Sequence, residues 1–504
     1  MTPAALFRAA SHLRVSSLPQ WAATLAALFF AAMYLATALP RVFYPYDLDF
    51  IEDSQLMQAL RFAQGQPVFV APNADFNPHV YMPLYTWLGG WLFKITGPSF
   101  APLRLLSFVA TLTTGLLLYW VARRESGRRW VGLVCAGLWL GGYRLSGFWY
   151  ELARVDALFV ALALSGFAVG LYARRSTWGL TLAALLLALA FFTKQTALLV
   201  GIGLAMYLFA IVGRRAWFFT LIYLSLVTIP LFTVNVLTDG WFFYHVFRLA
   251  SGDPVEIKRV MHYAGFELSG LMAGLSLMTM LTLLLGVRRA GLKVIREQPW
   301  LPGIGVAAVI SGIGRASVGG NLNNLMPGYA FLCLAPALLV REWNHCSPGP
   351  AWPHWRDRLI AALVLVQLAL GAYYPPRYIP SAAMRASGDR LIQRLAAIDG
   401  PVLVMMHPYY ALRAGKEPAT QIATLWYVRE RGQRPLPDDF ASRIENRYYS
   451  AIVSDESFFE TEPALQRLIR AHYYPAQTLT PEEAPTAPTG MAVTPQVIYL
   501  PRQP

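Results

Sequence analysis

The chain contains a series of uninterrupted apolar runs of roughly 16 to 22 residues, the length that a helix needs to cross the hydrocarbon core of a bilayer. The composition agrees with this pattern, because 56% of the 504 residues are hydrophobic and 14% are charged. An average soluble protein has about a quarter of its residues charged. We therefore predict an α-helical polytopic membrane protein with about 11 transmembrane helices.

Basic residues between the apolar runs indicate the orientation of the helices. Lysine and arginine are enriched in cytoplasmic loops, and here they cluster at every second turn, whereas acidic residues gather at the other turns. The clusters lie at positions 123–129, 174–175, 214–215, 288–296 and 341–358. The formal charge of +14 is therefore a topology signal and does not indicate nucleic-acid binding. We expect a multi-pass protein of the cell inner (plasma) membrane.

The first apolar run, at positions 21–39, ends in Ala36-Thr37-Ala38, which resembles a signal-peptidase site. The run is long for a signal peptide, so we expect an uncleaved first helix with Arg8 and Arg14 in the cytoplasm. The loop that follows then lies outside the cytoplasm. Within it, positions 55–63 and 81–93 are predicted to form a surface helix and an interfacial or re-entrant segment.

The composition changes at about position 376, where the long apolar runs end. We predict a transmembrane domain over residues 1–375 and a small extracytoplasmic α/β domain over residues 376–504. Segments with a strand pattern follow at 402–406, 449–453 and 497–500. Residues 480–490 are rich in proline and glutamate, which predicts a flexible segment.

Four carboxylates in seven residues follow the first apolar run, namely Asp47, Asp49, Glu52 and Asp53. Acidic groups at a membrane boundary are either a solvated rim or a reaction centre. Carboxylates suit a base that removes a proton from a hydroxyl group, and the lysines and arginines predicted at the same face suit a phosphate. Both kinds together indicate a reaction between a lipid phosphate and an alcohol.

Asp156 lies at the predicted outer end of a membrane helix, two residues after Arg154. An ionisable group there is costly and is often functional, although an Arg154–Asp156 pair that caps the helix explains it equally well. Lys194 is either a phosphate ligand or a lysine that reaches the interface from a hairpin turn. Tyr81 and Tyr85 fit the aromatic belt of a membrane interface.

The remaining outer-face residues also have structural explanations. Arg248 and Arg259 suit anionic lipid head groups as well as a substrate phosphate. Arg315 precedes two glycines and the asparagines Asn321 and Asn323, which is also the pattern of a simple polar turn. The residues by themselves leave these alternatives open.

Several short motifs occur in an order that resembles the GT-C membrane glycosyltransferases, in particular members similar to the protein O-mannosyltransferases and the lipid A aminoarabinose transferase. Those proteins carry an Asp-Glu pair in the first outer loop, followed by a helix with alanine and arginine, and then glycine. The corresponding residues here are Glu52-Asp53, Ala59, Arg61 and Gly65. Further matches are Tyr81-Met82-Pro83-Leu84-Tyr85, Arg154 with Asp156, and Phe192-Thr193-Lys194-Gln195-Thr196.

The resemblance implies a hexosyl- or pentosyl-transferase that moves a sugar from a polyprenyl-phosphate donor to an acceptor hydroxyl group, with inversion, at the outer face of the membrane. A carboxylate of the first loop would be the general base. The order Glu-Asp, in place of Asp-Glu, leaves open whether Glu52, Asp53 or Asp49 has this role. Asp156 would orient or assist the acceptor.

The resemblance also implies substrate contacts. The donor phosphate would be held by Lys194, Arg315, Arg248 and Arg259. Other substrate contacts would come from Tyr81, Tyr85, Arg154, Gln195, Asn321 and Asn323. The partners implied are a polyprenyl-phosphate-linked sugar, a glycolipid, polysaccharide or protein acceptor, and membrane lipids. No cofactor is indicated; some distant relatives use a divalent metal, which the acidic cluster could hold.

Two other classes of protein remain alternatives. A lipid or polysaccharide transporter or flippase would place ionisable residues within its helices, near the membrane midplane, whereas here the charges gather at one face. A non-catalytic assembly or polymer-binding subunit would use the outer domain as its working part. Loss of product on substitution of Glu52 or Asp156, with expression intact, would favour the enzyme.

Overall fold

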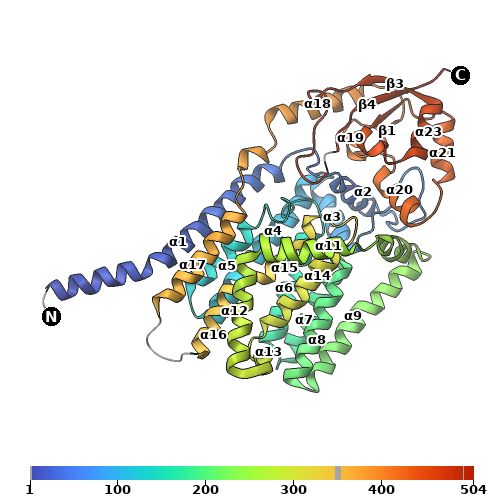
Figure 1. The fold of residues 1–504 in the computed structure, drawn as a ribbon. Coiled ribbons are helices and arrows are strands. Elements are labelled where there is room, and N and C mark those ends of the chain that lie inside the picture. Colours follow the sequence, from blue (N-terminus) through green and yellow to red (C-terminus); the bar gives the residue numbers. More distant parts are fainter. Residues whose placement is uncertain (1–2, 347–352, 492, 504) are drawn as a thin grey trace.

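The computed structural model describes residues 3–346, 353–491 and 493–503. A bundle of apolar helices carries a smaller α/β region at one end, and the helices of the loop after the first apolar helix lie between the two (Figure 1). In this part of the chain, seven helices are long and apolar enough to cross a membrane, judged by length and composition, and four shorter apolar helices accompany them. The predicted fold class is confirmed, whereas the number of membrane crossings stays a prediction.

The apolar helices follow the predicted runs closely. Their bounds are α1 Pro3–Val42, α4 Phe100–Ser126, α5 Arg129–Gly141, α6 Asp156–Tyr172, α7 Thr177–Thr193, α8 Leu198–Val212, α9 Arg215–Leu237, α12 Ala273–Ala290, α14 Trp300–Ala316, α15 Met326–Leu332, α16 Ala335–Cys346 and α17 His354–Leu370. Small residues allow close packing between them. A Cβ atom on Gly137 of α5 would lie 2.7 Å from the backbone oxygen of Ala27 in α1, so these two helices touch along their backbones.

The loops at the end of the bundle that carries the α/β region contain short helices. The two segments predicted in the first loop form α2 (Ile51–Ala63) and α3 (Pro83–Thr96), which pack against each other. A later loop contains α11 (Ile257–His262), which lies beside α14. Helix α2 also packs against α19 (Pro408–Arg413) of the α/β region, so it connects this region to the helix bundle.

The α/β region contains one four-stranded sheet of order β1-β2-β4-β3. Strand β1 (Val402–Val404) pairs in parallel with β2 (Ala451–Ser454), which is antiparallel to β4 (Val497–Pro501), and β3 (Tyr473–Thr478) is the antiparallel edge strand. The register aligns Leu403 with Ile452, and Val453 with Ile498. The helices of this region are α18 Ala382–Ala396, α19 Pro408–Arg413, α20 Ile422–Trp426, α21 Asp438–Glu445, α22 Glu456–Phe459 and α23 Pro463–His472.

Both faces of this sheet are buried, because alternate side chains along each strand point to opposite faces. Leu403 and Ile452 pack into a core with residues of α20, α21 and α23. Their neighbours along the strands pack on the other face with residues of α18 and with Tyr46 and Leu48 of the first loop. The first loop is therefore part of the hydrophobic core of the α/β region, which holds its acidic residues against the sheet.

Two features of this region differ from the sequence predictions. Strand β3 was not predicted because its side chains after Tyr473 are exposed and show no apolar alternation. The segment predicted to be flexible, 480–490, covers the first loop instead. The backbone N–H of Thr489 donates to the oxygen of Leu48 at 3.0 Å, and the side chain of Ala484 is buried.

Candidate active site

The acidic side chains of the first loop diverge because α2 begins among them. The side chain of Asp49 accepts a hydrogen bond from the backbone N–H of Ile51 at 3.1 Å, and its backbone oxygen accepts one from Glu52 at 2.9 Å. Asp49 therefore precedes the first turn, and each later residue is rotated by about 100° around the helix axis. As a result, Asp49, Glu52 and Asp53 point into three different environments.

Glu52 lies in a closed, fully buried arrangement. Its carboxylate forms a bidentate ion pair with Arg104 of α4, at 2.8 and 2.6 Å. It also accepts hydrogen bonds from the backbone N–H groups of Leu48 and Ala153, both at 2.7 Å. Both side chains of the ion pair are 0% exposed. Four donors occupy the two oxygens of Glu52, so this carboxylate connects the first loop to the helix bundle.

Asp53 points toward the α/β region. One of its oxygens accepts a hydrogen bond from the backbone N–H of Tyr409 at 2.7 Å, and the other lies 3.9 Å from Nδ1 of His407. His407 also lies 3.1 Å from an oxygen of Asp47 and 3.3 Å from an oxygen of Asp455. These four buried groups form a charge network between the first loop and the sheet.

The protonation states in this network depend on one another. Burial opposes a charge on His407, but the Asp47 and Asp455 carboxylates hold the pKa of His407 well above its usual range. Burial and the charge of Asp47 raise the pKa of Asp53 well above its usual value. The ligand atoms of Asp47, Asp53 and His407 lie within 4.8 Å of one another, so these three side chains could also hold a divalent cation.

Asp49 begins a different network, which extends into the helix bundle. Its Oδ1 atom lies 2.9 Å from Nη1 of Arg154, and Nε of Arg154 lies 3.5 Å from an oxygen of Asp156. The other oxygen of Asp156 lies 2.7 Å from Nζ of Lys194. Two carboxylates and two cations therefore alternate from the first loop to the end of α7.

The asparagines and Tyr81 complete this network. Asn323 donates to Asp156 at 3.0 Å, Lys194 donates to the side-chain oxygen of Asn324 at 3.0 Å, and Arg154 donates to the hydroxyl oxygen of Tyr81 at 2.8 Å. Lys194 can reach Asp156 because it directly follows the last residue of α7, Thr193, and adopts an extended backbone conformation. Its charge also lies at a helix C-terminus, where cations are favoured.

A cavity of about 470 Å³ opens on this network. Six of the residues singled out in the sequence line it, namely Asp49, Tyr81, Arg154, Lys194, Asn321 and Asn323. Asp156 lies behind Arg154 and Lys194 and pairs with both. The opposite wall comes from the α/β region and includes Trp426, Tyr427 and Phe458. Burial raises the pKa of Asp49, and the charge of Arg154 opposes this increase.

The other candidate residues do not line this cavity. Arg315 forms an ion pair with Glu267 at 2.5 Å and donates to the backbone oxygen of Gly320 at 2.6 Å, and Arg259 donates to the same oxygen at 3.2 Å. These two arginines therefore support the glycine-rich turn that forms part of the cavity wall. Arg248 is exposed and lies over the ring of Tyr244.

Tyr85 and Gln195 also take part in local packing. The hydroxyl group of Tyr85 lies 2.9 Å from that of Ser107 and donates to the backbone oxygen of Leu103, in the buried contact between α3 and α4. Gln195 donates to the backbone oxygen of Val246 at 3.3 Å. Both residues thus stabilise the surroundings of the cavity.

Sequence reasoning missed several residues on which the site depends. Arg104 organises Glu52, and Arg41 forms a fully buried ion pair with Glu151 at 2.5 Å. A lone arginine within an apolar run is a recognisable signal, because such a charge needs a partner. Trp149, whose Nε1 atom donates to Asp49 at 3.3 Å, had no comparable signal.

Comparison with known proteins adds evidence that is independent of the site. Residues 77–238 match the family model of the dolichyl-phosphate-mannose-protein mannosyltransferases. A search of curated proteins found no match.

Solved structures show the same fold over most of the chain. ArnT from Cupriavidus metallidurans in the apo state aligns over 94% of this chain and 97% of its own, with 14% identity and a TM-score of 0.59. The same protein bound to undecaprenyl phosphate has the same coverage, 13% identity and a TM-score of 0.56. The apo oligosaccharyltransferase from Archaeoglobus fulgidus aligns over 91% of this chain and 73% of its own, with 12% identity and a TM-score of 0.52. The resemblance to the GT-C membrane glycosyltransferases is confirmed in fold, and in sequence over residues 77–238.

Proposed function

We propose that this protein is a membrane glycosyltransferase that moves a sugar from a polyprenyl-phosphate donor to an acceptor hydroxyl group, with inversion. The observation that carries the proposal is that Asp49 and Lys194 line the same cavity. They are connected through Arg154 and Asp156 by ion pairs. A carboxylate and an ammonium group that face one cavity can serve the two ends of one displacement reaction.

Asp49 is the best candidate among the three carboxylates that the sequence left open. It lines the cavity, and burial raises its pKa, which brings a carboxylate closer to the range of an efficient general base. Glu52 already accepts four hydrogen bonds, and Asp53 faces His407 and Tyr409. We assign Glu52 and Asp53 to positioning the loop, and Asp156 to holding Arg154 and Lys194 in place.

In the proposed reaction, one bond forms and one breaks at the anomeric carbon, and one proton moves to Asp49. The acceptor oxygen forms a bond to the anomeric carbon of the sugar, and its proton passes to Asp49. The bond from the anomeric carbon to the phosphate oxygen breaks, and its electron pair leaves with the polyprenyl phosphate. That phosphate gains one negative charge, which the ammonium group of Lys194, with Arg154 beside it, would stabilise.

An apolar flank beside the cavity suits the lipid chain of the donor. Ile257 and Met261 of α11 are each about 70% exposed and point away from the protein core. Arg259 of the same helix contacts the turn at 317–320, part of which lines the cavity. A polyprenyl chain that covers these side chains would bring its phosphate to the cavity.

Removal of the ammonium group tests the donor site. We expect Lys194→Met to lower kcat/KM for a polyprenyl-phosphate sugar by about a hundredfold, the usual scale for one lost electrostatic contact to a developing charge. The matched control is Lys293→Met, a change of the same kind at an exposed residue after α12 that does not line the cavity. The measurement is transfer of radiolabelled sugar by the purified protein. Turnover of Lys194→Met equal to that of the control would exclude this role.

The transporter alternative makes a different prediction for the same assay of the wild-type protein. A flippase moves lipid without forming a glycosidic bond, so it would yield no transfer product in the wild-type protein. The charged groups of the cavity pair with one another at the ends of helices α6 and α7, whereas transporters typically place their sites at discontinuous helices near the midplane. The position of these groups at helix ends therefore favours an enzyme that acts at the membrane face over a transporter.

We also propose that residues 1–375 form the transmembrane catalytic domain, and that the cavity and residues 376–504 lie on the extracytoplasmic side of the inner membrane. A cysteine introduced as Gln477→Cys, in the exposed strand β3 of a Cys346→Ser background, should react with an impermeant thiol reagent in intact cells. The natural Cys346 is exposed at the end of α16 and should react only after permeabilisation. Mass spectrometry of labelled peptides makes the measurement, and the reverse pattern would contradict the proposed orientation.

A further inference from the structure

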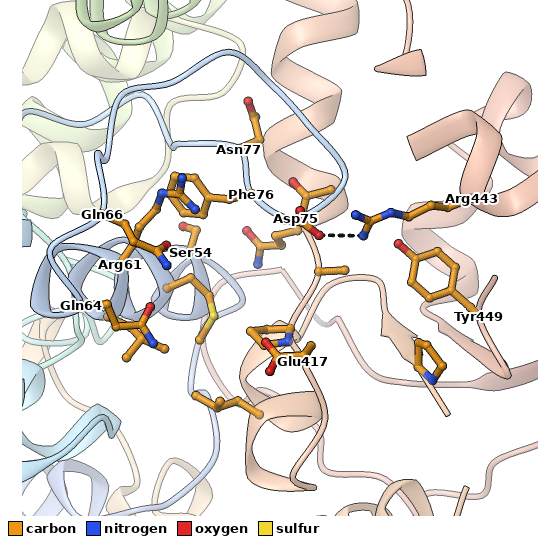
Figure 2. Close-up of a pocket in the computed structure, with 18 of the residues that line it drawn as sticks. Ser54, Arg61, Gln64, Gln66, Asp75, Phe76, Asn77, Glu417, Arg443 and Tyr449 are labelled. Atoms are coloured by element: carbon orange, nitrogen blue, oxygen red, sulfur yellow. Dashed lines mark hydrogen bonds and ion pairs between the residues drawn. The ribbon is translucent and has the colours of Figure 1, made fainter. Parts of the chain in front are cut away.

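A second cavity, of about 620 Å³, lies between α2 and the α/β region. Figure 2 shows its lining, which is rich in amide and charged side chains from both sides. The mouth is formed by exposed residues, including Gln64, Gln66 and Glu417, whereas Asn77, Thr420 and Gln421 at the lining are at least 95% buried. The cavity therefore leads from solvent to buried polar groups.

The buried groups have hydrogen-bonding capacity that the protein does not use. Neither the Oδ1 nor the Nδ2 atom of Asn77 has a partner within the described residues, and the same holds for the hydroxyl group of Thr420 and the Oε1 atom of Gln421. Leaving such groups without a partner costs free energy. An amide that can donate and accept at once, in a cavity of ligand size, is suited to a polar ligand.

The charges of the lining indicate that the ligand is uncharged. Two arginines, Arg61 and Arg443, are matched by two carboxylates, Asp75 and Glu417. Arg443 is paired with Asp75 at 2.6 Å, and Arg61 donates to the backbone oxygen of Pro67 at 2.6 Å. Both cations are thus engaged, and the cavity has no excess charge with which to attract a phosphate or a cation.

Aromatic rings complete the lining. Phe76, Tyr448 and Tyr449 border the cavity; Phe76 and Tyr449 are buried, whereas Tyr448 is half exposed and offers its ring to a ligand. The C–H groups of a sugar ring pack against an aromatic face, while its hydroxyl groups exchange hydrogen bonds with side-chain amides. Amides, aromatic faces and zero net charge together match a neutral oligosaccharide better than a peptide, which would require apolar pockets for its side chains.

The second cavity shares its walls with the cavity that Asp49 and Lys194 line, which we call the catalytic cavity. Asn77 lies two residues from His79, and Gln421 lies two residues from Ala423; His79 and Ala423 both line the catalytic cavity. Helix α2 likewise contributes Ile51 to one cavity and Ser54 to the other. A ligand in the second cavity would therefore lie directly behind the wall of the reaction site.

We propose that the second cavity binds a neutral oligosaccharide segment of the acceptor, away from the hydroxyl group that reacts. This inference rests on the proposed glycosyltransferase function and narrows its acceptor to a glycan-bearing molecule. Binding energy from such a remote segment positions the reacting group.

The test is the binding of defined sugars to the full-length protein in detergent. Maltotetraose, cellotetraose and mannotetraose are each titrated and observed by saturation-transfer NMR. We expect at least one of them to bind, and Asn77→Leu and Tyr448→Ala each to weaken that binding by about tenfold, the scale of one or two lost contacts. Gln477→Leu, which removes an exposed amide on β3, is the control and should bind as wild type does.

Two results would overturn the inference: no binding of any of the three sugars, or equal affinity in the wild type and both cavity variants. Tyr448 is half exposed, so its replacement tests the cavity even if Asn77→Leu fails to fold. The Asp49→Asn variant separates the two proposals, because it should lose transfer but still bind the sugar. Loss of transfer in Asp49→Asn without any sugar binding would leave the catalytic proposal intact and refute the glycan cavity. If Asp49→Asn binds the sugar and its transfer activity is unaltered, the glycan cavity stands and the catalytic role of Asp49 is refuted.

Discussion

Replacing Asp49 by asparagine should reduce sugar transfer by at least about a hundredfold, the usual scale for the loss of a general base. Asparagine keeps a side-chain oxygen that can accept the hydrogen bond from the backbone N–H of Ile51, so the loop should retain its conformation. The variant removes the ability to take a proton and the charge that faces Arg154, and its NH2 group replaces the oxygen that accepts the hydrogen bond from Trp149. Transfer of labelled sugar by the purified protein, with KM determined for both substrates, measures the effect, which should fall on kcat.

The control for this prediction is Asp53→Asn, an identical chemical change four residues later. Asp53 does not line the catalytic cavity, and asparagine can still accept the hydrogen bond from Tyr409. We expect Asp53→Asn to retain most of the transfer activity. Wild-type turnover in Asp49→Asn together with inactivity in Asp53→Asn would assign the base to Asp53.

The pH dependence of transfer gives a second readout for Asp49. A general base acts only when it is deprotonated, and burial raises the pKa of Asp49 above its ordinary value. The rate should therefore fall as the pH decreases through this raised pKa, and the acid limb should lie above the range of an exposed aspartate. This limb should be absent from the residual activity of Asp49→Asn, and its persistence there would assign it to another group.

Replacing Arg104 by methionine should have the largest effect on stability. The change leaves the carboxylate of Glu52 fully buried without its counter-ion, and breaking a buried pair in this way costs about 3 to 5 kcal/mol. Arg104 also donates to the backbone oxygens of Arg41, Tyr44 and Tyr46, which shape the loop before Asp49. We expect a marked fall in the midpoint of thermal unfolding in detergent, together with loss of transfer.

Two variants control for this effect. Arg443→Met makes the same change in an ion pair whose members are 28% and 66% exposed, where about 1 kcal/mol or less is at stake. The double variant Glu52→Gln/Arg104→Met removes both charges and should be more stable than Arg104→Met alone. An unfolding midpoint of Arg104→Met equal to that of Arg443→Met would show that Glu52 does not depend on Arg104.

Much of the fold could be predicted because each part of it has a local physical cause. A backbone in lipid must satisfy its own hydrogen bonds, so a long apolar run forms a helix wherever it lies in the chain. The strands β1, β2 and β4 were predicted from short runs of buried apolar residues. Strand β3 escaped prediction because it is an edge strand whose exposed side chains carry no such pattern.

The roles of the acidic residues could not be resolved in the same way. Glu52 matched the position of the catalytic residue in the resembling family, yet its carboxylate is saturated by Arg104 and by two backbone groups. Asp49, three residues earlier, faces the cavity. Asp49 lies before the first turn of α2, whereas Glu52 lies within that turn, so the helical repeat does not set their relative directions. The partners that occupy each direction come from distant parts of the chain.

The amino-acid sequence by itself determined that this protein is a polytopic helical membrane protein with a small α/β region, and that acidic and basic groups gather at one end of its helices. Periodicity, run length and charge clusters carry this information, because they act over neighbouring residues. Only the tertiary structure decided which of these groups share a cavity and which are paired and buried. That choice depends on contacts such as Glu52 with Arg104 and Asp49 with Arg154, whose members are 52 and 105 positions apart, and no local pattern specifies such distant partners.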